Sequence, residues 1–301
     1  MGIKKLNTFL NQFCRNETFK KHFSELYGKK VTVDIMIYIY KYAAERTIIE
    51  GIYLLCSLFK KYNIIPIFVF DGKTPQIKQK LIEKRRDRRE KSQIKYNELL
   101  KSSDINTPKI KQKLLSLKRD SIKLKKSDII DVKTIIDCFG YTYMVADYEA
   151  DKLCAELVIS NIAYACISED TDLFVYGCPR ILRYLNLFNE VCILYDFNLI
   201  LEKLKMNLKT FKKFCILSGC DYKETSLPIF KVYNLYLKYI KKERKVPFME
   251  WINNWGDDYE IENQVLSMYD CEKKEKISIT NKNINKSALI EVLKKDNFIF
   301  V

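Results

Sequence analysis

Three apolar segments of this chain each run into acidic residues, and this pattern limits the folds that the chain can adopt. Residues 31–33 are followed by Asp34, residues 64–70 by Asp71, and residues 163–168 by Asp170 and Asp172. A helical pattern over about residues 36–62 separates the first two segments. This alternation predicts an α/β fold with a central, mostly parallel sheet and helices on both faces. Residues just past the carboxyl ends of parallel strands line the ligand crevice, so we expect these acids to face one cleft.

Glu149 and Asp151 add two acids to this set, at the predicted start of a helix. Deep inside a helix such positions point to different faces, but in the first turn both side chains can lean toward the strand ends. Carboxylates gathered in this way repel one another unless protons or cations neutralise them. With oxygen ligands alone, the cation that fits is Mg²⁺ or Mn²⁺. The alternative is that acids in a first helical turn only complement the helix dipole.

The positive charge of the chain is concentrated in one segment. Residues 73–126 hold 19 lysines and arginines against six acidic residues, an excess of 13 out of a net charge of +15 for the whole chain. Residues 73–130 have a helical, charged pattern without strands, which predicts a helical insertion between strands. A basic segment beside an acidic metal site suits an enzyme that acts on nucleic acid. A solvated, charged helical hairpin is the alternative.

The rest of the sequence pattern predicts both helices and strands. We expect helices over residues 5–27 and 197–216, strands near residues 141–145, 181–184 and 191–195, and a mostly helical segment over residues 223–301. The ten cysteines include no C-x-x-C pair, and His22 is the single histidine, so the sequence does not predict a zinc site. The apolar runs are too short to span a bilayer. We therefore expect a soluble protein in a reducing, intracellular setting, without a membrane partner.

Six short motifs then occur in a familiar order. They are M-G-I at residues 1–3, V-D at Asp34, V-F-D-G-K-x-P-Q at 69–76, E-A-D at 149–151, E-D-T-D at 169–172 and G-C-D-Y at 219–222. In this set the sequence resembles the flap endonuclease family, the structure-specific 5′ nucleases that include the XPG-type and exonuclease 1-type enzymes. The resemblance covers roughly residues 1–222. The lysine-, isoleucine- and asparagine-rich composition further resembles the versions encoded by large cytoplasmic DNA viruses, poxviruses among them.

The resemblance implies a core of the PIN-like 5′ nuclease type and a site with two divalent ions, Mg²⁺ or, in its place, Mn²⁺. The implied metal ligands are Asp34, Asp71, Glu149, Asp151, Asp170, Asp172 and Asp221. The family also uses a lysine and an arginine after its F-D-G-K motif, and these positions hold Lys78 and Arg85. Both could stabilise charge on the scissile phosphate. A solvated helical face is the alternative for them in so basic a segment.

The same resemblance implies several contacts with DNA. Tyr40 corresponds to a tyrosine that stacks on a base near the cut, although a place in the core is an alternative for it. Gly2 would lie by the active site. The basic insertion corresponds to the helical arch of the family, at about residues 73–130, where a single-stranded 5′ end passes. Lys84, Arg88 and Arg89 are expected to bind nucleic acid there.

The sequence departs from the family after Tyr222. Residues 223–237 contain no glycine, whereas the family continues into a helix-two-turn-helix whose glycines allow close approach to duplex phosphates and a potassium ion. We therefore expect a nuclease core over residues 1–222 and a helical C-terminal region over residues 223–301 with a degenerate duplex-binding motif. No motif for docking on a sliding clamp is present, while replication or recombination proteins could be partners.

The function expected from these features is hydrolysis of branched or flapped DNA in replication, repair or recombination. A 5′→3′ exonuclease or a junction resolvase of the same family is the first alternative. A DNA-binding scaffold without catalysis is an alternative of another class, although such a protein should have lost an acid. A PIN-type ribonuclease would not need the long basic insertion. The expected location is the nucleus, or the cytoplasm for a viral protein.

Overall fold

The computed structural model describes residues 2–45, 47–101, 107–222, 227–242, 246–253, 263–275, 277, 279 and 281–294. The chain forms two compact units that interleave along the sequence. The first unit comprises Met1–Glu25, Lys30–Thr32 and Asp151–Ile277, and the second comprises Leu26–Lys29, Val33–Ala150 and Ser278–Val301. None of the helices formed by the described residues has the length and apolar character needed to cross a membrane.

A seven-stranded sheet has the order β1-β7-β6-β5-β2-β3-β4, and β2 (Lys30–Asp34) contributes residues to both units. The other strands are β1 (Thr18–His22), β3 (Ile65–Phe70), β4 (Thr142–Val145), β5 (Ala165–Ile167), β6 (Arg180–Asn186) and β7 (Val191–Asp196). β3 pairs with β4 and β5 with β6 in parallel, whereas β7 pairs with β6 and with β1 in antiparallel fashion. The predicted α/β fold with a mostly parallel sheet is confirmed.

The first unit contains one helix near the start of the chain and the helices that form between residues 150 and 268. Its helices are α1 (Leu6–Phe13), α7 (Ala150–Ile159), α8 (Asp172–Tyr176), α9 (Phe197–Leu204), α10 (Leu208–Ser218), α11 (Ile229–Lys241), α12 (Phe248–Asn253) and α13 (Asn263–Met268). The ring of Phe9 is fully buried between those of Phe13, Phe214 and Tyr233, at centroid distances of 4.9–5.2 Å. This aromatic cluster joins α1 to α10 and α11.

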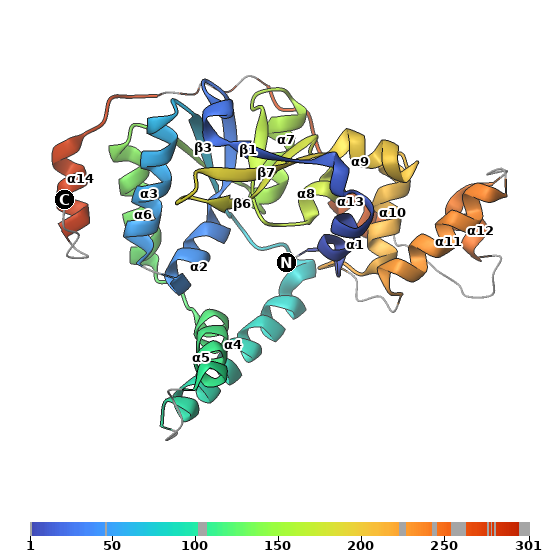
Figure 1. Ribbon diagram of the computed structural model, residues 1–301, viewed down its shortest axis with the longest axis horizontal. Coiled ribbons are helices and arrows are strands. Elements are labelled where there is room, and N and C mark those ends of the chain that lie inside the picture. The colour runs from blue at the N-terminus through green and yellow to red at the C-terminus, as the bar shows by residue number, and fades with distance from the viewer. Residues whose placement is uncertain are drawn as a thin grey trace. The chain divides into compact units, whose positions relative to one another are not determined.

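The second unit contains α2 (Ile35–Glu45), α3 (Ile48–Lys61), α4 (Gln79–Leu100), α5 (Pro108–Ser121), α6 (Lys126–Cys138) and α14 (Lys286–Lys294). Helices α4 and α5 lie side by side as a helical pair (Figure 1). They form within the predicted insertion, and no strand occurs among the described residues between β3 and β4. Helix α14 packs on α6, and its preceding segment is held there by Asn285 N–H, which donates to Cys138 O at 2.8 Å.

Three of the predicted elements differ in the structure. Residues 5–27 do not form one helix, because Thr18–His22 pairs with β7 as strand β1 and this long-range pairing outweighs the local periodicity. The helix expected over residues 36–62 is two helices, since the Thr47 hydroxyl accepts a hydrogen bond from Glu50 N–H and starts α3. The helix expected over residues 197–216 is also divided, because Asn207 caps the start of α10.

Candidate active site

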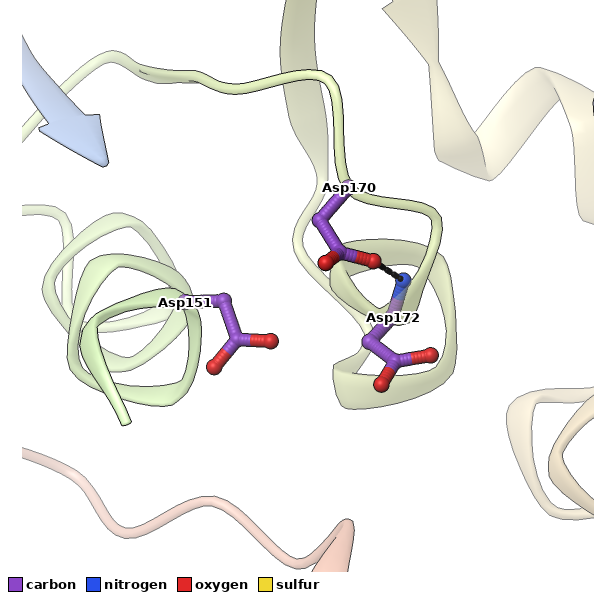
Figure 2. A group of neighbouring side chains, drawn as sticks. All are labelled: Asp151, Asp170 and Asp172. Carbon is purple, nitrogen blue, oxygen red and sulfur yellow. Dashed lines mark hydrogen bonds between the residues drawn. The ribbon is translucent and has the colours of Figure 1, made fainter. Parts of the chain in front are cut away.

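Three carboxylates lie close together in the first unit, and Figure 2 shows the side chain of Asp151 pointing toward Asp170 and Asp172. Asp151 lies in the first turn of α7, Asp170 follows β5, and Asp172 is the first residue of α8. One oxygen from each lies within 4.8 Å of the others. Their exposed fractions are only 8%, 8% and 1%. A buried set of oxygen donors at this spacing fits a hard divalent cation such as Mg²⁺ or Mn²⁺.

The loop that carries two of these acids is fixed by its own hydrogen bonds. Asp170 N–H donates to the Ser168 hydroxyl at 3.1 Å, and Asp172 N–H donates to Asp170 Oδ1 at 3.0 Å (Figure 2). Ser168 N–H in turn donates to Leu182 O at 3.2 Å, which ties the loop to β6. The two carboxylates are therefore held close together before any cation arrives.

The N-terminal segment packs against the same loop. Ile3 N–H donates to the Thr171 hydroxyl at 2.8 Å, and Lys4 N–H donates to Gly219 O at 3.0 Å. Gly2 has a φ of +81°, and a Cβ placed on it would overlap Asp170 and Thr171. Residues 2–4 thus connect the acidic loop with the turn that leads to Asp221.

Replacing Gly2 by alanine is expected to disturb this loop. The positive φ and the overlap together should lower the free energy of unfolding by about 1–3 kcal/mol. Displacement of the two carboxylates should weaken the binding of a divalent cation by about tenfold to a hundredfold. Thermal unfolding measures the first effect, and calorimetric titration of Mn²⁺ measures the second.

Gly28→Ala is the matched control, because Gly28 has a φ of +69° with no atom within 4 Å of an added Cβ. This variant carries backbone strain alone, so it should lose stability without losing affinity for Mn²⁺. Equal affinities for Mn²⁺ in the two alanine variants would show that Gly2 does not support the acidic loop.

Two side chains near Asp172, those of Cys215 and Tyr269, do not add negative charge to the site. Burial and, next, the charge of Asp172 raise the pKa of Cys215 well above its ordinary value. The same two causes raise the pKa of Tyr269. Both side chains are therefore neutral near pH 7.

Within the second unit, the candidate acid Asp71 lies close to Ala150. Asp71 Oδ1 accepts a hydrogen bond from Ala150 N–H at 2.9 Å, so the acid that follows β3 caps the helix. Gly72 N–H donates to Tyr148 O at 2.7 Å, and a Cβ on Gly72 would overlap Ala146 O. Only glycine allows this close approach, which explains the residue after Asp71 in the F-D-G-K motif.

Lys78 lies at the N-cap of α4 and reaches Glu149. Its Nζ donates to Glu149 Oε1 at 2.6 Å, and the exposed fraction of Lys78 is only 7%. A buried ammonium group in contact with a carboxylate is not a solvated surface lysine. Lys78 is thus placed beside one of the seven candidate ligands.

The remaining candidate residues range from buried to exposed. Asp34 is buried at the end of β2, while Asp221 is half-buried in the turn after α10. Tyr40 on α2 is 40% exposed, which favours a surface role over a place in the core. Among the described residues, only Asp151, Asp170 and Asp172 meet the spacing needed for a shared cation. Two units divide the seven acids, with Asp34, Asp71 and Glu149 in the second.

The helical pair α4–α5 presents basic side chains around a cavity. Arg88 on α4 pairs with Asp120 on α5, with 2.9 Å between Nη2 and Oδ2. Next to this pair lies a cavity of about 420 Å³, whose basic lining residues are Lys84, Arg88, Lys91, Lys95 and Lys113. Arg89 lines a second cavity on the pair, and Arg85 is exposed on α4.

Two residues of the site were not predicted as functional. Glu169 and Thr171 belong to the E-D-T-D motif. The Thr171 hydroxyl accepts a hydrogen bond from Ile3 N–H in the N-terminal segment. The motif contained them, but their partners lie far away in the sequence, so spacing alone could not reveal the contacts.

Comparison with known proteins decides the family. The XPG N-terminal domain matches residues 1–92, and the XPG I-region matches residues 140–221. The chain belongs to the XPG family of 5′ nucleases. Both matched segments contain candidate acids, and the unmatched residues between them include the end of α4 and all of α5.

Relatives of this XPG-family chain are flap endonucleases. Flap endonuclease 1 of Theileria parva is 30% identical over 280 residues, which cover 86% of this chain and 54% of that protein. Flap endonuclease 1 of Enterocytozoon bieneusi is 27% identical, covering 86% of this chain and 75% of that protein. The chain spans about half the length of the Theileria relatives it matches.

Solved structures share the fold of this XPG-family chain. The catalytic core of Rad2 in complex with a DNA substrate superimposes with a TM-score of 0.71 at 20% identity, covering 98% of this chain and 95% of that one. Flap endonuclease-1 from Methanococcus jannaschii gives a TM-score of 0.64 at 22% identity, covering 94% and 91%. At these identities the likeness establishes the PIN-like nuclease fold and no more.

Proposed function

We propose that this protein is a divalent-metal-dependent, structure-specific 5′ nuclease that hydrolyses phosphodiester bonds in branched or flapped DNA. The observation that carries the proposal is the buried set of three aspartates within 4.8 Å in a chain of the XPG family. Its flap endonuclease relatives and the DNA-bound Rad2 core support DNA as the substrate.

Two Mg²⁺ ions, or Mn²⁺ in their place, are the proposed cofactors. Asp151, Asp170 and Asp172 would hold a cation directly, and Asp34, Asp71, Glu149 and Asp221 would complete the set, some of them through water. Paired divalent cations in such sites activate a water molecule and stabilise the attacking and leaving oxygens of a phosphodiester. Glu149 and Asp151 stand two residues apart in the E-A-D motif, and this spacing supports a shared role for both carboxylates.

Two basic side chains, Lys78 and Arg85, are proposed to bind the scissile phosphate. Lys78 is held in a buried position by Glu149 and would donate to an oxygen of the scissile phosphate as negative charge grows there. Arg85 would bind the same phosphate from α4. Gly2 and Tyr40 would contact the DNA near the cut, Tyr40 by stacking on a base.

The helical pair α4–α5 is proposed to hold the single-stranded 5′ end. Lys84, Arg88 and Arg89 lie around its two cavities, which contain few acids to offset them. Such a basic surface binds the phosphate backbone without reading the base sequence. This contact would orient a free 5′ end and select the substrate by its structure.

The decisive experiment is cleavage of a 5′-labelled flap duplex in Mg²⁺, with EDTA and with Asp71→Asn as controls. Asparagine keeps an oxygen for Ala150 N–H but removes the charge, so the helix start should survive. A short product cut near the junction, lost in both controls, is the expected result. Retained DNA binding without cleavage in Mg²⁺ or Mn²⁺ would overturn the proposed nuclease activity and favour a DNA-binding scaffold.

A junction resolvase is the second candidate, and one comparison favours it. Human GEN1 in complex with Holliday junction DNA shares the fold with a TM-score of 0.69 at 17% identity. Symmetric cuts in a four-way junction, made faster than flap cleavage, would support the resolvase. Release of mononucleotides alone would instead identify a 5′→3′ exonuclease.

A further inference from the structure

Arg183 on β6 is a charged side chain enclosed by the protein. Its exposed fraction is 1%, and its guanidinium lies near the rings of Phe174, Tyr184 and Tyr195, at centroid distances of 5.2–5.8 Å. An arginine stays charged in proteins, so its burial is costly unless hydrogen bonds and a counter-charge compensate it. The partners of Arg183 therefore indicate what this position is for.

The main partner of Arg183 is Glu169, the residue before Asp170. Arg183 Nη2 donates to Glu169 O at 2.7 Å, and Nε lies 3.8 Å from Glu169 Oε2. Nη1 donates to Asn7 Oδ1 on α1 at 2.6 Å. The guanidinium thus binds both the main chain and the carboxylate at the first position of the E-D-T-D motif.

The neighbouring residue of β6 completes this contact. Tyr184 N–H donates to Glu169 Oε1 at 2.6 Å. Tyr184 has a φ of +55°, and the register of β6 with β7 shifts between Arg183 and Asn186. A non-glycine residue in the left-handed region is uncommon and costs free energy. The irregular backbone directs the amide toward Glu169, so two successive residues of β6 hold the start of the acidic loop.

We propose that Arg183 is a positioning residue that orients Asp170 and Asp172 for metal binding by holding Glu169. The inference rests on the proposed function, since it assigns to the acidic loop a resident divalent cation. The permanent charge of Arg183 also offsets part of the repulsion within the loop before a cation is bound. Neither Arg183 nor Glu169 needs to touch the metal or the DNA for this role.

The test is calorimetric titration of Mn²⁺ into the metal-free protein without DNA, comparing wild type with Arg183→Lys. Lysine keeps the charge but cannot form the fork of hydrogen bonds to the carbonyl and to Asn7. Groups that orient metal ligands typically contribute about 10–100-fold to metal affinity, so the Kd for Mn²⁺ should rise at least about tenfold. The affinity for DNA in EDTA should stay within about twofold, because the phosphate contacts are intact.

Arg180→Lys is the matched control on the same strand. Arg180 Nε donates to Tyr164 O at 2.6 Å and its guanidinium lies over the Tyr164 ring, away from the acidic loop. This variant loses an equivalent arginine–carbonyl bond, and its Kd for Mn²⁺ should equal that of wild type. A folded Arg183→Lys protein with wild-type Mn²⁺ affinity, or an equal loss in Arg180→Lys, would overturn the proposal.

Glu169→Ala tests the same contact from the other side and decides the matter if Arg183→Lys does not fold. The Glu169 side chain is 25% exposed, so its removal leaves little cavity. Its loss should also raise the Kd for Mn²⁺, and an unchanged value would contradict the positioning role. Failure of wild type itself to bind Mn²⁺ would instead overturn the proposed function.

Discussion

Replacing Asp172 by asparagine is expected to lower the rate of metal-dependent cleavage by at least about a thousandfold, which corresponds to about 4 kcal/mol in the activation free energy. Asp172 is 1% exposed and shares its space with Asp151 and Asp170 within 4.8 Å. Asparagine keeps the shape and removes the charge that a divalent cation needs. Single-turnover cleavage of the flap duplex at saturating Mg²⁺ measures the effect.

The same substitution should stabilise the metal-free protein. Three buried carboxylates repel one another when no cation is bound, and asparagine removes one of the three charges. Relief of about 1 kcal/mol would raise the Tm in EDTA by about 2–4 °C. In Mn²⁺ the wild type should have the higher Tm of the two proteins, because it gains more stability from the bound ion than the variant does.

Asp270→Asn is the control for this experiment. Asp270 lies in the same unit, and its side chain is 72% exposed in an ion pair with Lys212. Its substitution should change neither the cleavage rate nor the Tm by more than a small amount, since exposed ion pairs contribute little. An Asp172→Asn protein that cleaves within about tenfold of wild type, or that melts lower in EDTA, would contradict a metal site built on repelling carboxylates.

The strands that carry the acids could be predicted because each is a short apolar run with a local signal at its end. β2, β3 and β5 therefore appear where the sequence indicated them, with Asp34, Asp71 and Asp170 at or just beyond their carboxyl ends. Asp170 and Asp172 both follow β5, so their closeness in space could be predicted from their closeness in the sequence. The break before α3 depends on a single Thr47 cap, which a periodic pattern does not reveal.

Contacts between distant segments could not be predicted in the same way. β1 forms because it pairs with β7, whose partner residues lie 169 to 177 positions further along the chain. Arg183 and Glu169 are 14 residues apart, and the positive φ of Tyr184, whose N–H also donates to Glu169, has no local sequence signal. Lys78 and Glu149 are 71 residues apart. Resemblance to the family identified Lys78 as functional, while its burial and its carboxylate partner required the structure.

Replacing Lys78 by methionine is expected to reduce the cleavage rate about a hundredfold to a thousandfold. Methionine keeps much of the length and apolar bulk of the lysine stem but cannot donate to a phosphate oxygen. The affinity for DNA in EDTA should fall little, because one buried ammonium group adds little to a surface as basic as α4–α5. The loss should therefore appear in kcat rather than in binding.

Two comparison variants separate catalysis from stability and from general charge. Lys78→Met leaves the Glu149 carboxylate without its ammonium partner and should lower the Tm, since a broken buried pair is destabilising. Adding Glu149→Gln should restore part of the Tm but not the rate. Lys84→Met, on the exposed side of α4, should instead weaken DNA binding. It should also reduce the slope of log K for DNA against log salt concentration by about one. A Lys78→Met protein whose kcat equals that of wild type, while its DNA affinity falls as in Lys84→Met, would show that Lys78 is only part of the basic surface.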